Sequence, residues 1–140
     1  MQHTAIVRGV PKTIGEGLVE YLERRPIDQD LAEDEHAEYV RALAELGCRI
    51  IHLPPLDELP DSVFVEDTAV VVDEMAILTR PGAESRRAEV DSISPTLGEY
   101  RPLIRMKAPA TLDGGDVLRV GRKIWVGSTS RTNAAGIAQL

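Results

Sequence analysis

The sequence has 140 residues, of which 43% are apolar and only 4% aromatic, and its formal net charge is −7. This length and composition predict one domain, or part of a larger one, with a core of Val, Ile, Leu and Ala. The negative charge argues against binding to nucleic acid or to an anionic membrane surface. No apolar run approaches the roughly 20 residues of a membrane-spanning helix. Because the N-terminus has no basic and apolar leader, we expect a cytoplasmic protein.

The first part of the chain predicts a strand, a helix and a second strand. The first strand covers residues 3–8. Apolar residues then recur at helical spacing over residues 30–46, with Asp28 or Asp30 as the N-cap. Gly47 suits the left-handed position that ends a helix. Residues 48–53 predict the second strand.

The rest of the chain predicts two hairpins, each followed by a helix. Residues 64–65 and 68–72 predict strand on either side of two acids, and residues 75–79 return after a turn. A helix begins within residues 84–90 and is limited by Pro95 and Gly98, and residues 103–106 form a short strand. The second hairpin covers 116–126, and a helix capped by Thr132 or Asn133 follows. This repeated hairpin, helix and strand predicts an α/β repeat architecture.

Three carboxylates, those of Asp61, Glu66 and Asp67, follow an apolar lead-in. Neighbouring carboxylates repel one another unless a positive group lies among them. A guanidinium suits that position, because carboxylates bind its planar fork through paired hydrogen bonds. A magnesium or calcium ion is the next candidate, although no calcium-loop pattern is present. A polar loop with its acids facing water is about as compatible with the composition.

Two further sequence patterns are compatible with a binding site for a charged ligand. The two glycines of Asp-Gly-Gly-Asp, residues 113–116, allow positive φ or a close approach to a ligand, although an ordinary turn is the favoured interpretation of these four residues alone. Arg86 and Arg87 stand at an expected helix start, where the helix dipole prefers acids, and Arg131 repeats this placement. Such arginines can hold an anionic group such as a carboxylate, although an exposed arginine is the ordinary case.

The residues that usually react are scarce. Cys48 is the sole cysteine, which excludes an internal disulfide, and its predicted strand favours a buried, small apolar side chain. The three histidines, at positions 3, 36 and 52, lie far from the acidic motifs in sequence and lack the spacing of metal ligands. We therefore assign no histidine to catalysis and expect no metal.

Four segments in this order resemble the dimethylarginine dimethylaminohydrolases. They are L-P-D-S-V-F-V-E-D-T-A-V-V at 59–71, I-L-T-R-P-G-A-E-S-R-R-A-E-V at 77–90, A-T-L-D-G-G-D-V-L at 110–118 and S-R-T-N at 130–133. The resemblance runs from Ile6 to the last residue and corresponds to the N-terminal half of that family. It implies a pentein, an α/β propeller of five ββαβ units around a central site. Residues 1–140 would supply about two to three of these units as the N-terminal part of a single domain.

The resemblance also implies an activity. The family hydrolyses asymmetric dimethylarginine or monomethylarginine to citrulline and an alkylamine, without a cofactor. A cysteine thiolate attacks the guanidinium carbon, a histidine transfers protons, and an acid orients the histidine. Asp113 matches that acid.

The remaining site residues implied by the resemblance bind the methylarginine substrate. Glu66 and Asp67 match the guanidinium binders. Asp61 resembles the acid near the substrate's amino end, where the Val10 backbone also contributes. The pair expected to hold the substrate carboxylate is Arg86 and Arg131.

The sequence departs from the family in lacking its cysteine and histidine motifs, and Cys48 falls where the family has no nucleophile. The isolated chain is therefore expected to be inactive. One alternative is a non-catalytic module that binds an arginine-like ligand, or that assembles with itself or with a partner supplying the other units. Another is a different pentein, such as an arginine deiminase or an amidinotransferase.

Overall fold

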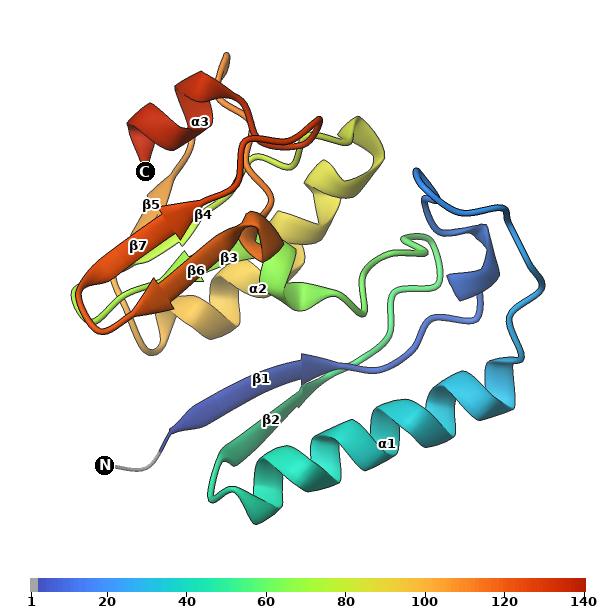
Figure 1. Ribbon diagram of the computed structural model, residues 1–140. Helices are drawn as coiled ribbons and strands as arrows, with labels where there is room; N and C mark the ends of the chain where they lie inside the picture. Colours follow the sequence, from blue (N-terminus) through green and yellow to red (C-terminus); the bar gives the residue numbers. More distant parts are fainter. Residues whose placement is uncertain (1–2) are drawn as a thin grey trace. The chain divides into compact units, whose positions relative to one another are not determined.

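The computed structural model describes residues 3–140 (Figure 1). The chain divides into two compact units, Met1–Phe64 and Val65–Leu140. Its elements follow the order strand, helix, strand, hairpin, helix, strand, hairpin, helix, which confirms the predicted α/β class. None of the helices in the described residues is long and apolar enough to cross a membrane. The cytoplasmic location stays a prediction.

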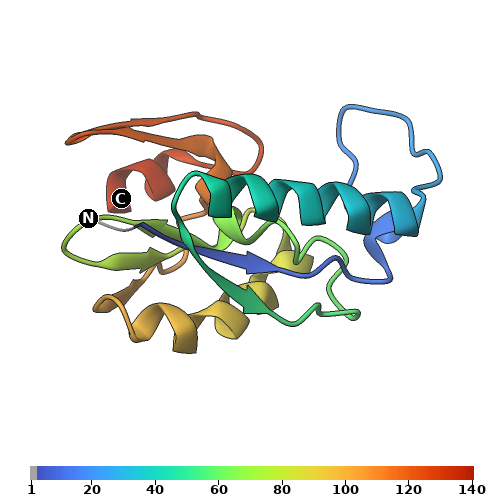
Figure 2. The same ribbon diagram turned by 90° about the horizontal axis from the view of Figure 1, so that it is seen from below.

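The first unit is a βαβ arrangement. Strands β1 (Thr4–Arg8) and β2 (Arg49–Leu53) pair in parallel. Helix α1 (Gln29–Glu45) connects them and packs against β2, and Figures 1 and 2 both show it running along the strands. A parallel pair requires such a crossover, because a tight turn can only join antiparallel strands.

Helix α1 begins and ends where the sequence predicts. The side chain of Asp28 accepts a hydrogen bond from the backbone N–H of Leu31 at 3.1 Å and so caps the first turn. Gly47 ends the helix with a φ of 86°, in the left-handed region that favours glycine. The expected apolar face is only partly covered, since no residue of α1 is buried and Tyr39 is 58% exposed.

The second unit contains a three-stranded sheet and a separate hairpin. Strand β4 (Ala76–Leu78) pairs antiparallel with β3 (Ala69–Val71) and parallel with β5 (Leu103–Arg105). Helix α2 (Arg87–Gly98) joins β4 to β5 and packs on both. The hairpin consists of β6 (Val117–Val120) and β7 (Lys123–Val126), and helix α3 (Ala134–Gln139) follows.

The main core lies in this second unit. Helix α2 buries Val90, Ile93 and Leu97. A further cluster joins Val70 of β3 to buried residues that follow β5, namely Met106, Ala110 and Leu112. Helix α3 begins at its expected cap, where the Asn133 side chain accepts a hydrogen bond from the N–H of Gly136 at 2.7 Å.

Two predicted boundaries are wrong. Val65–Thr68 forms a 3₁₀ turn, η2, where the sequence predicts strand at residues 64–65 and again from residue 68. The buried hydroxyl of Thr68 donates to the carbonyl of Val65 at 2.6 Å, a local bond that competes with a strand ladder. Pro95 lies inside α2 and does not end it. The buried side chains of Ile93 and Leu97 flank this proline, so packing outweighs the lost backbone hydrogen bond.

Candidate functional site

The turn η2 presents two of the predicted acids, Glu66 and Asp67, at one end of the three-stranded sheet. A buried threonine that follows β4 holds this turn, since the hydroxyl of Thr79 donates to the carbonyl of Asp67 at 2.7 Å. A strand would send Glu66 and Asp67 to opposite faces. The turn keeps both on one rigid element, as a binding site requires.

A second 3₁₀ turn, η4 (Gly114–Asp116), packs against η2 and explains the paired glycines. A Cβ at Gly114 would lie 2.0 Å from the carbonyl oxygen of Glu66, so only glycine fits there. The N–H of Gly115 donates to Oδ1 of Asp67 at 2.9 Å. The close approach that the sequence suggested for a ligand is therefore made, in this structure, to the backbone of η2.

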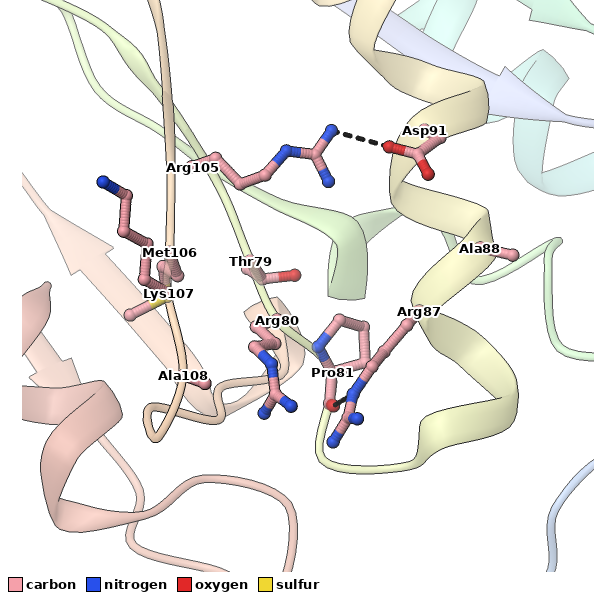
Figure 3. A pocket seen from close by; sticks show the side chains of 10 residues that line it. All are labelled: Thr79, Arg80, Pro81, Arg87, Ala88, Asp91, Arg105, Met106, Lys107 and Ala108. Carbon is pink, nitrogen blue, oxygen red and sulfur yellow. Dashed lines mark hydrogen bonds and ion pairs between the residues drawn. The ribbon is translucent and has the colours of Figure 1, made fainter.

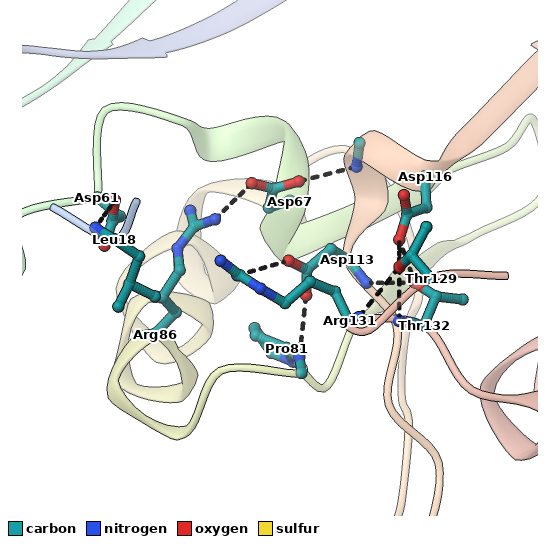
Figure 4. Close-up of polar contacts among 12 residues, drawn as sticks. Leu18, Asp61, Asp67, Pro81, Arg86, Asp113, Asp116, Thr129, Arg131 and Thr132 are labelled. Carbon is teal, nitrogen blue, oxygen red and sulfur yellow. Dashed lines mark hydrogen bonds and ion pairs between the residues drawn. The ribbon is translucent and has the colours of Figure 1, made fainter. Parts of the chain in front are cut away.

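Asp67 is also paired with Arg86, which precedes α2 (Figure 4). The Arg86 guanidinium is buried, and its Nε and Nη2 donate to the two oxygens of Glu89 at 3.0 and 2.8 Å. Burial lowers the pKa of Arg86, but the hydrogen bonds and charges of Glu89 and Asp67 outweigh burial, and the pKa is raised overall. Arg86 is therefore a permanent cation held between two carboxylates.

Asp113 is buried and pairs with Arg131. Its Oδ1 accepts the N–H of Gly82 at 2.9 Å, and its Oδ2 accepts Nη1 of Arg131 at 3.2 Å (Figure 4). A Cβ at Gly82 would lie 2.5 Å from the backbone of Arg131, so the glycine allows these two segments to touch. The structure thus fixes Asp113 from two sides.

Two threonine hydroxyls hold the loop that carries Arg131. The buried Thr132 donates to Oδ2 of Asp116 at 2.6 Å and accepts the backbone N–H of Asp113 at 3.1 Å. Thr129 donates to the same Asp116 oxygen at 2.7 Å. The second aspartate of the Asp-Gly-Gly-Asp motif therefore positions the loop of Arg131.

Burial and like charges shift two carboxyl groups of this region. Burial raises the pKa of Asp113, and the nearby charge of Asp67 adds to the rise, while the Gly82 N–H, Arg131 and Arg86 oppose it. Desolvation by neighbouring atoms also raises the pKa of Glu66, although its side chain reaches the surface. The charge of Asp67 also raises the pKa of Glu66, whereas the backbone N–H of Glu66 and the charge of Arg86 lower it. An added cation would stabilise the ionised form of both carboxyl groups.

We call six of these residues the acid–arginine cluster. Four carboxylates share it with two guanidinium groups, so the ionised cluster carries excess negative charge and favours a cationic ligand. The described residues contain no group of three or more His, Cys, Asp or Glu placed to hold a metal ion. The members are Glu66, Asp67, Arg86, Glu89, Asp113 and Arg131.

The other two predicted site residues, Val10 and Asp61, belong to the first unit. Val10 is buried, and the Asp61 carboxylate accepts the backbone N–H of Leu18 at 3.1 and 3.2 Å (Figure 4). A Cβ at Gly17 would lie 2.8 Å from Oδ1 of Asp61. This acid therefore fixes the glycine-containing loop after β1, a contact that the sequence did not predict.

Sequence reasoning also missed Glu89, which lies three residues after Arg86 on the same turn. That spacing places two helical side chains side by side and was the available signal. Cys48, the expected buried strand residue, lies directly before β2 and is only partly buried. Its thiol is in the first unit, while the acid–arginine cluster is in the second.

The chain is similar to curated proteins and solved structures over nearly all of its length. It is 45% identical over 137 residues to the N(G),N(G)-dimethylarginine dimethylaminohydrolase of Streptomyces coelicolor, a match covering 97% of this chain and 53% of that protein. The solved enzyme of this name from Pseudomonas aeruginosa, a cysteine-to-serine mutant complexed with citrulline, is 39% identical with a TM-score of 0.94. That match covers 99% of this chain and 55% of the solved one.

More distant structures share the fold alone. The product-bound N-terminal domain of ArgZ, a cyanobacterial arginine dihydrolase, is 18% identical with a TM-score of 0.84, over 96% of this chain and 51% of that one. No family model matches the chain. The chain spans about half the length of the curated relatives that it matches.

Proposed function

We propose that this chain, whose sequence and fold place it in the pentein superfamily among proteins of the dimethylarginine dimethylaminohydrolase type, is the substrate-binding part of a methylarginine hydrolase. The reaction would convert asymmetric dimethylarginine or monomethylarginine to citrulline and an alkylamine. The acid–arginine cluster carries this proposal, because it joins excess carboxylates to arginines within one compact unit. Residues 1–140 would form part of a single pentein domain.

Glu66 and Asp67 would bind the guanidinium of the ligand. Asp67 already accepts hydrogen bonds from Gly115 and Arg86, which fix its orientation. A carboxylate oxygen can accept a second hydrogen bond. Asp67 can therefore take a ligand N–H without losing its supports. The raised pKa of Glu66 supports the same assignment, since a bound cation would stabilise its ionised form.

The anionic end of the ligand would be held by Arg86 and Arg131. The Arg131 side chain is 20% exposed and that of Arg86 only 6%, so Arg131 is the more accessible cation. Arg86 would contribute mainly by orienting Asp67. Asp61, together with the Val10 backbone, would bind the α-amino group.

Asp113 would orient the catalytic histidine. It is buried, fixed by Gly82 and Arg131, and has a raised pKa. A carboxylate held in this way selects one tautomer of a histidine and stabilises its protonated form. The reaction needs a cysteine thiolate to attack the guanidinium carbon, expel the amine and form an intermediate that water hydrolyses. Residues 1–140 supply neither this cysteine nor this histidine, so they would bind substrate without turning it over.

Binding of methylarginine to the chain tests the proposal. Calorimetric titration with asymmetric dimethylarginine should show saturable binding, and Asp67→Asn should weaken it by roughly tenfold or more, because a charged hydrogen bond is lost. Asp73→Asn is the matched control, since it removes one acid at the exposed β3–β4 turn. Equal losses for both variants, or no binding by the unmodified chain, would contradict the proposal.

Two comparisons separate the alternatives. Equal affinity for arginine and methylarginine would favour another pentein, such as an arginine deiminase or an amidinotransferase. Citrulline release from methylarginine should stay at background for the chain alone. Rapid release that survives Cys48→Ala would overturn the expectation that the chain only binds. Static light scattering measures the remaining possibility, self-association.

A further inference from the structure

A second charged site lies in the same unit as the acid–arginine cluster and shares no residue with it. It is a pocket of about 460 Å³ between the start of α2 and the segments that follow β4 and β5 (Figure 3). Asp91 is the single acid in its lining. Four cationic side chains line it, namely Arg80, Arg87, Arg105 and Lys107.

Two of these arginines are fixed by backbone carbonyls. Nη1 of Arg80 donates to the carbonyl of Ala110 at 3.2 Å, and Nε of Arg87 donates to that of Pro81 at 3.2 Å. In Figure 3 both guanidinium groups extend to the same end of the pocket, with Pro81 between them. A carbonyl acceptor holds a guanidinium in place without neutralising its charge. Arg80 and Arg87 are therefore oriented, while their positive charge is largely kept.

Two acids near the pocket pair with two of its four cations and leave a formal excess of two positive charges. Glu84 pairs with Arg87 at 2.8 Å, but its side chain is 85% exposed, so water screens the pair. Asp91 pairs with Arg105 at 2.7 Å and is also mostly exposed. In Figure 3 the Lys107 ammonium extends away from the two fixed arginines. The pocket thus concentrates positive charge in a chain whose net charge is −7.

We propose that this pocket binds a small organic anion carrying at least two negative charges, as phosphate or carboxylate groups. Two guanidinium forks fixed at one end of a hollow match the geometry of such groups, which accept paired hydrogen bonds. The volume is within the range of small-molecule sites. An anion between Arg80 and Arg87 would also relieve their mutual repulsion. The proposal is independent of methylarginine binding, because the pocket shares no residue with the acid–arginine cluster.

Titration with inorganic phosphate and with succinate tests the proposal, at an ionic strength held constant with sodium chloride. The double variant Arg80→Gln/Arg87→Gln should raise the Kd for the preferred anion by at least about tenfold, through the loss of charged hydrogen bonds. The matched control is Arg122→Gln/Lys123→Gln, which removes two positive charges at the β6–β7 turn outside the pocket. The control should change the Kd by less than about twofold, since exposed charges act weakly through salt.

The two anions distinguish the source of the ligand. Tighter binding of phosphate indicates a phosphorylated molecule, and tighter binding of succinate indicates a dicarboxylate. Equal weakening by both double variants, or no saturable binding of either anion, would overturn the proposal. Amide chemical shifts of the unmodified chain give a second measurement that needs no variant. Ala88 and Ala108, which line the pocket, should shift on titration, and shifts confined to other residues would contradict it.

Discussion

Glu89 is the residue on which the geometry of the acid–arginine cluster most depends. It is 2% exposed, and both of its oxygens accept hydrogen bonds from Arg86. Arg86 in turn contacts Asp67. Glu89 therefore helps to orient Asp67, a proposed ligand-binding acid, through Arg86. The described part of the chain has no buried side-chain polar atom without a hydrogen-bond partner. Removing one partner would create such an atom.

Glu89→Ala should therefore lower the free energy of unfolding by about 3 to 5 kcal/mol, because it removes the carboxylate that pairs with Nε and Nη2 of a buried guanidinium. Urea denaturation measures this change. Glu84→Ala provides the control, since it breaks an exposed pair with Arg87 and should cost less than about 1 kcal/mol. Similar costs for the two variants would show that Arg86 does not depend on Glu89.

Asp113→Asn should change the pH dependence of stability. Burial raises the pKa of Asp113 in the folded chain. Such a group stabilises the fold below its unfolded pKa, about 3.9, and this stabilisation is lost as the pH rises through the folded pKa. The free energy of unfolding of the unmodified chain should therefore fall, relative to Asp113→Asn, as the pH rises above about 4. Urea titrations across this range provide the measurement, and parallel profiles would count against the raised pKa.

At this scale, the sequence predicted most of the charged residues that gather, but it missed Glu89 and did not show how the residues pair. Asp67, Arg86, Asp113 and Arg131 were all predicted as site residues, and the structure brings them together. Their mutual ion pairs were missed, because a sequence pattern does not show which acid a given arginine meets. Their roles toward a ligand stay predictions.

At the scale of elements, glycine positions decide where helices end and turns touch. Gly47 ends α1 with a φ of 86°, and an added Cβ would meet no neighbouring atom. Only the positive φ therefore disfavours another residue at this position. Gly47→Ala should therefore destabilise the chain by about 1 kcal/mol. Gly15→Ala is the control, because Gly15 has equal space and no positive φ. Thermal unfolding of both variants checks the difference, and an equal Tm would contradict it.

The order of elements was predictable because periodic apolar runs and caps are local signals. Asp28, Gly47 and Asn133 act as the sequence indicates. The errors occur where contacts distant in sequence decide the structure. The turn at Val65–Thr68 depends on Thr79 and on η4, and the helix through Pro95 depends on side chains buried beneath it. Such contacts leave no local pattern.

At the scale of the whole molecule, burial differs between the two units. The first unit buries Val7 and Val10 as its apolar core, whereas the second buries nine apolar side chains on β3, β4, α2 and the segment after β5. Burial of apolar area is the main favourable contribution to folding. The second unit should therefore be the more stable one.

Hydrogen exchange should detect this difference. Amides of α1 should exchange at a lower opening free energy than those of α2, because local stability follows the apolar packing beneath an element. Mass spectrometry of deuterated peptides from the two helices measures it. Identical opening free energies would indicate one cooperative unit and would favour the single domain predicted from the sequence.

The β6–β7 hairpin gives the chain an optical probe. Trp125 is its sole tryptophan, lies on β7 opposite Leu118 and is 50% exposed. Leu118, Val120 and Ile124 of the same hairpin are exposed apolar side chains as well. Indole emission moves to shorter wavelength when water is removed from the ring. A protein surface that covers this hairpin, whether a second copy or another chain, would thus shift the tryptophan emission. The measurement needs no label and leaves the acid–arginine cluster unaltered.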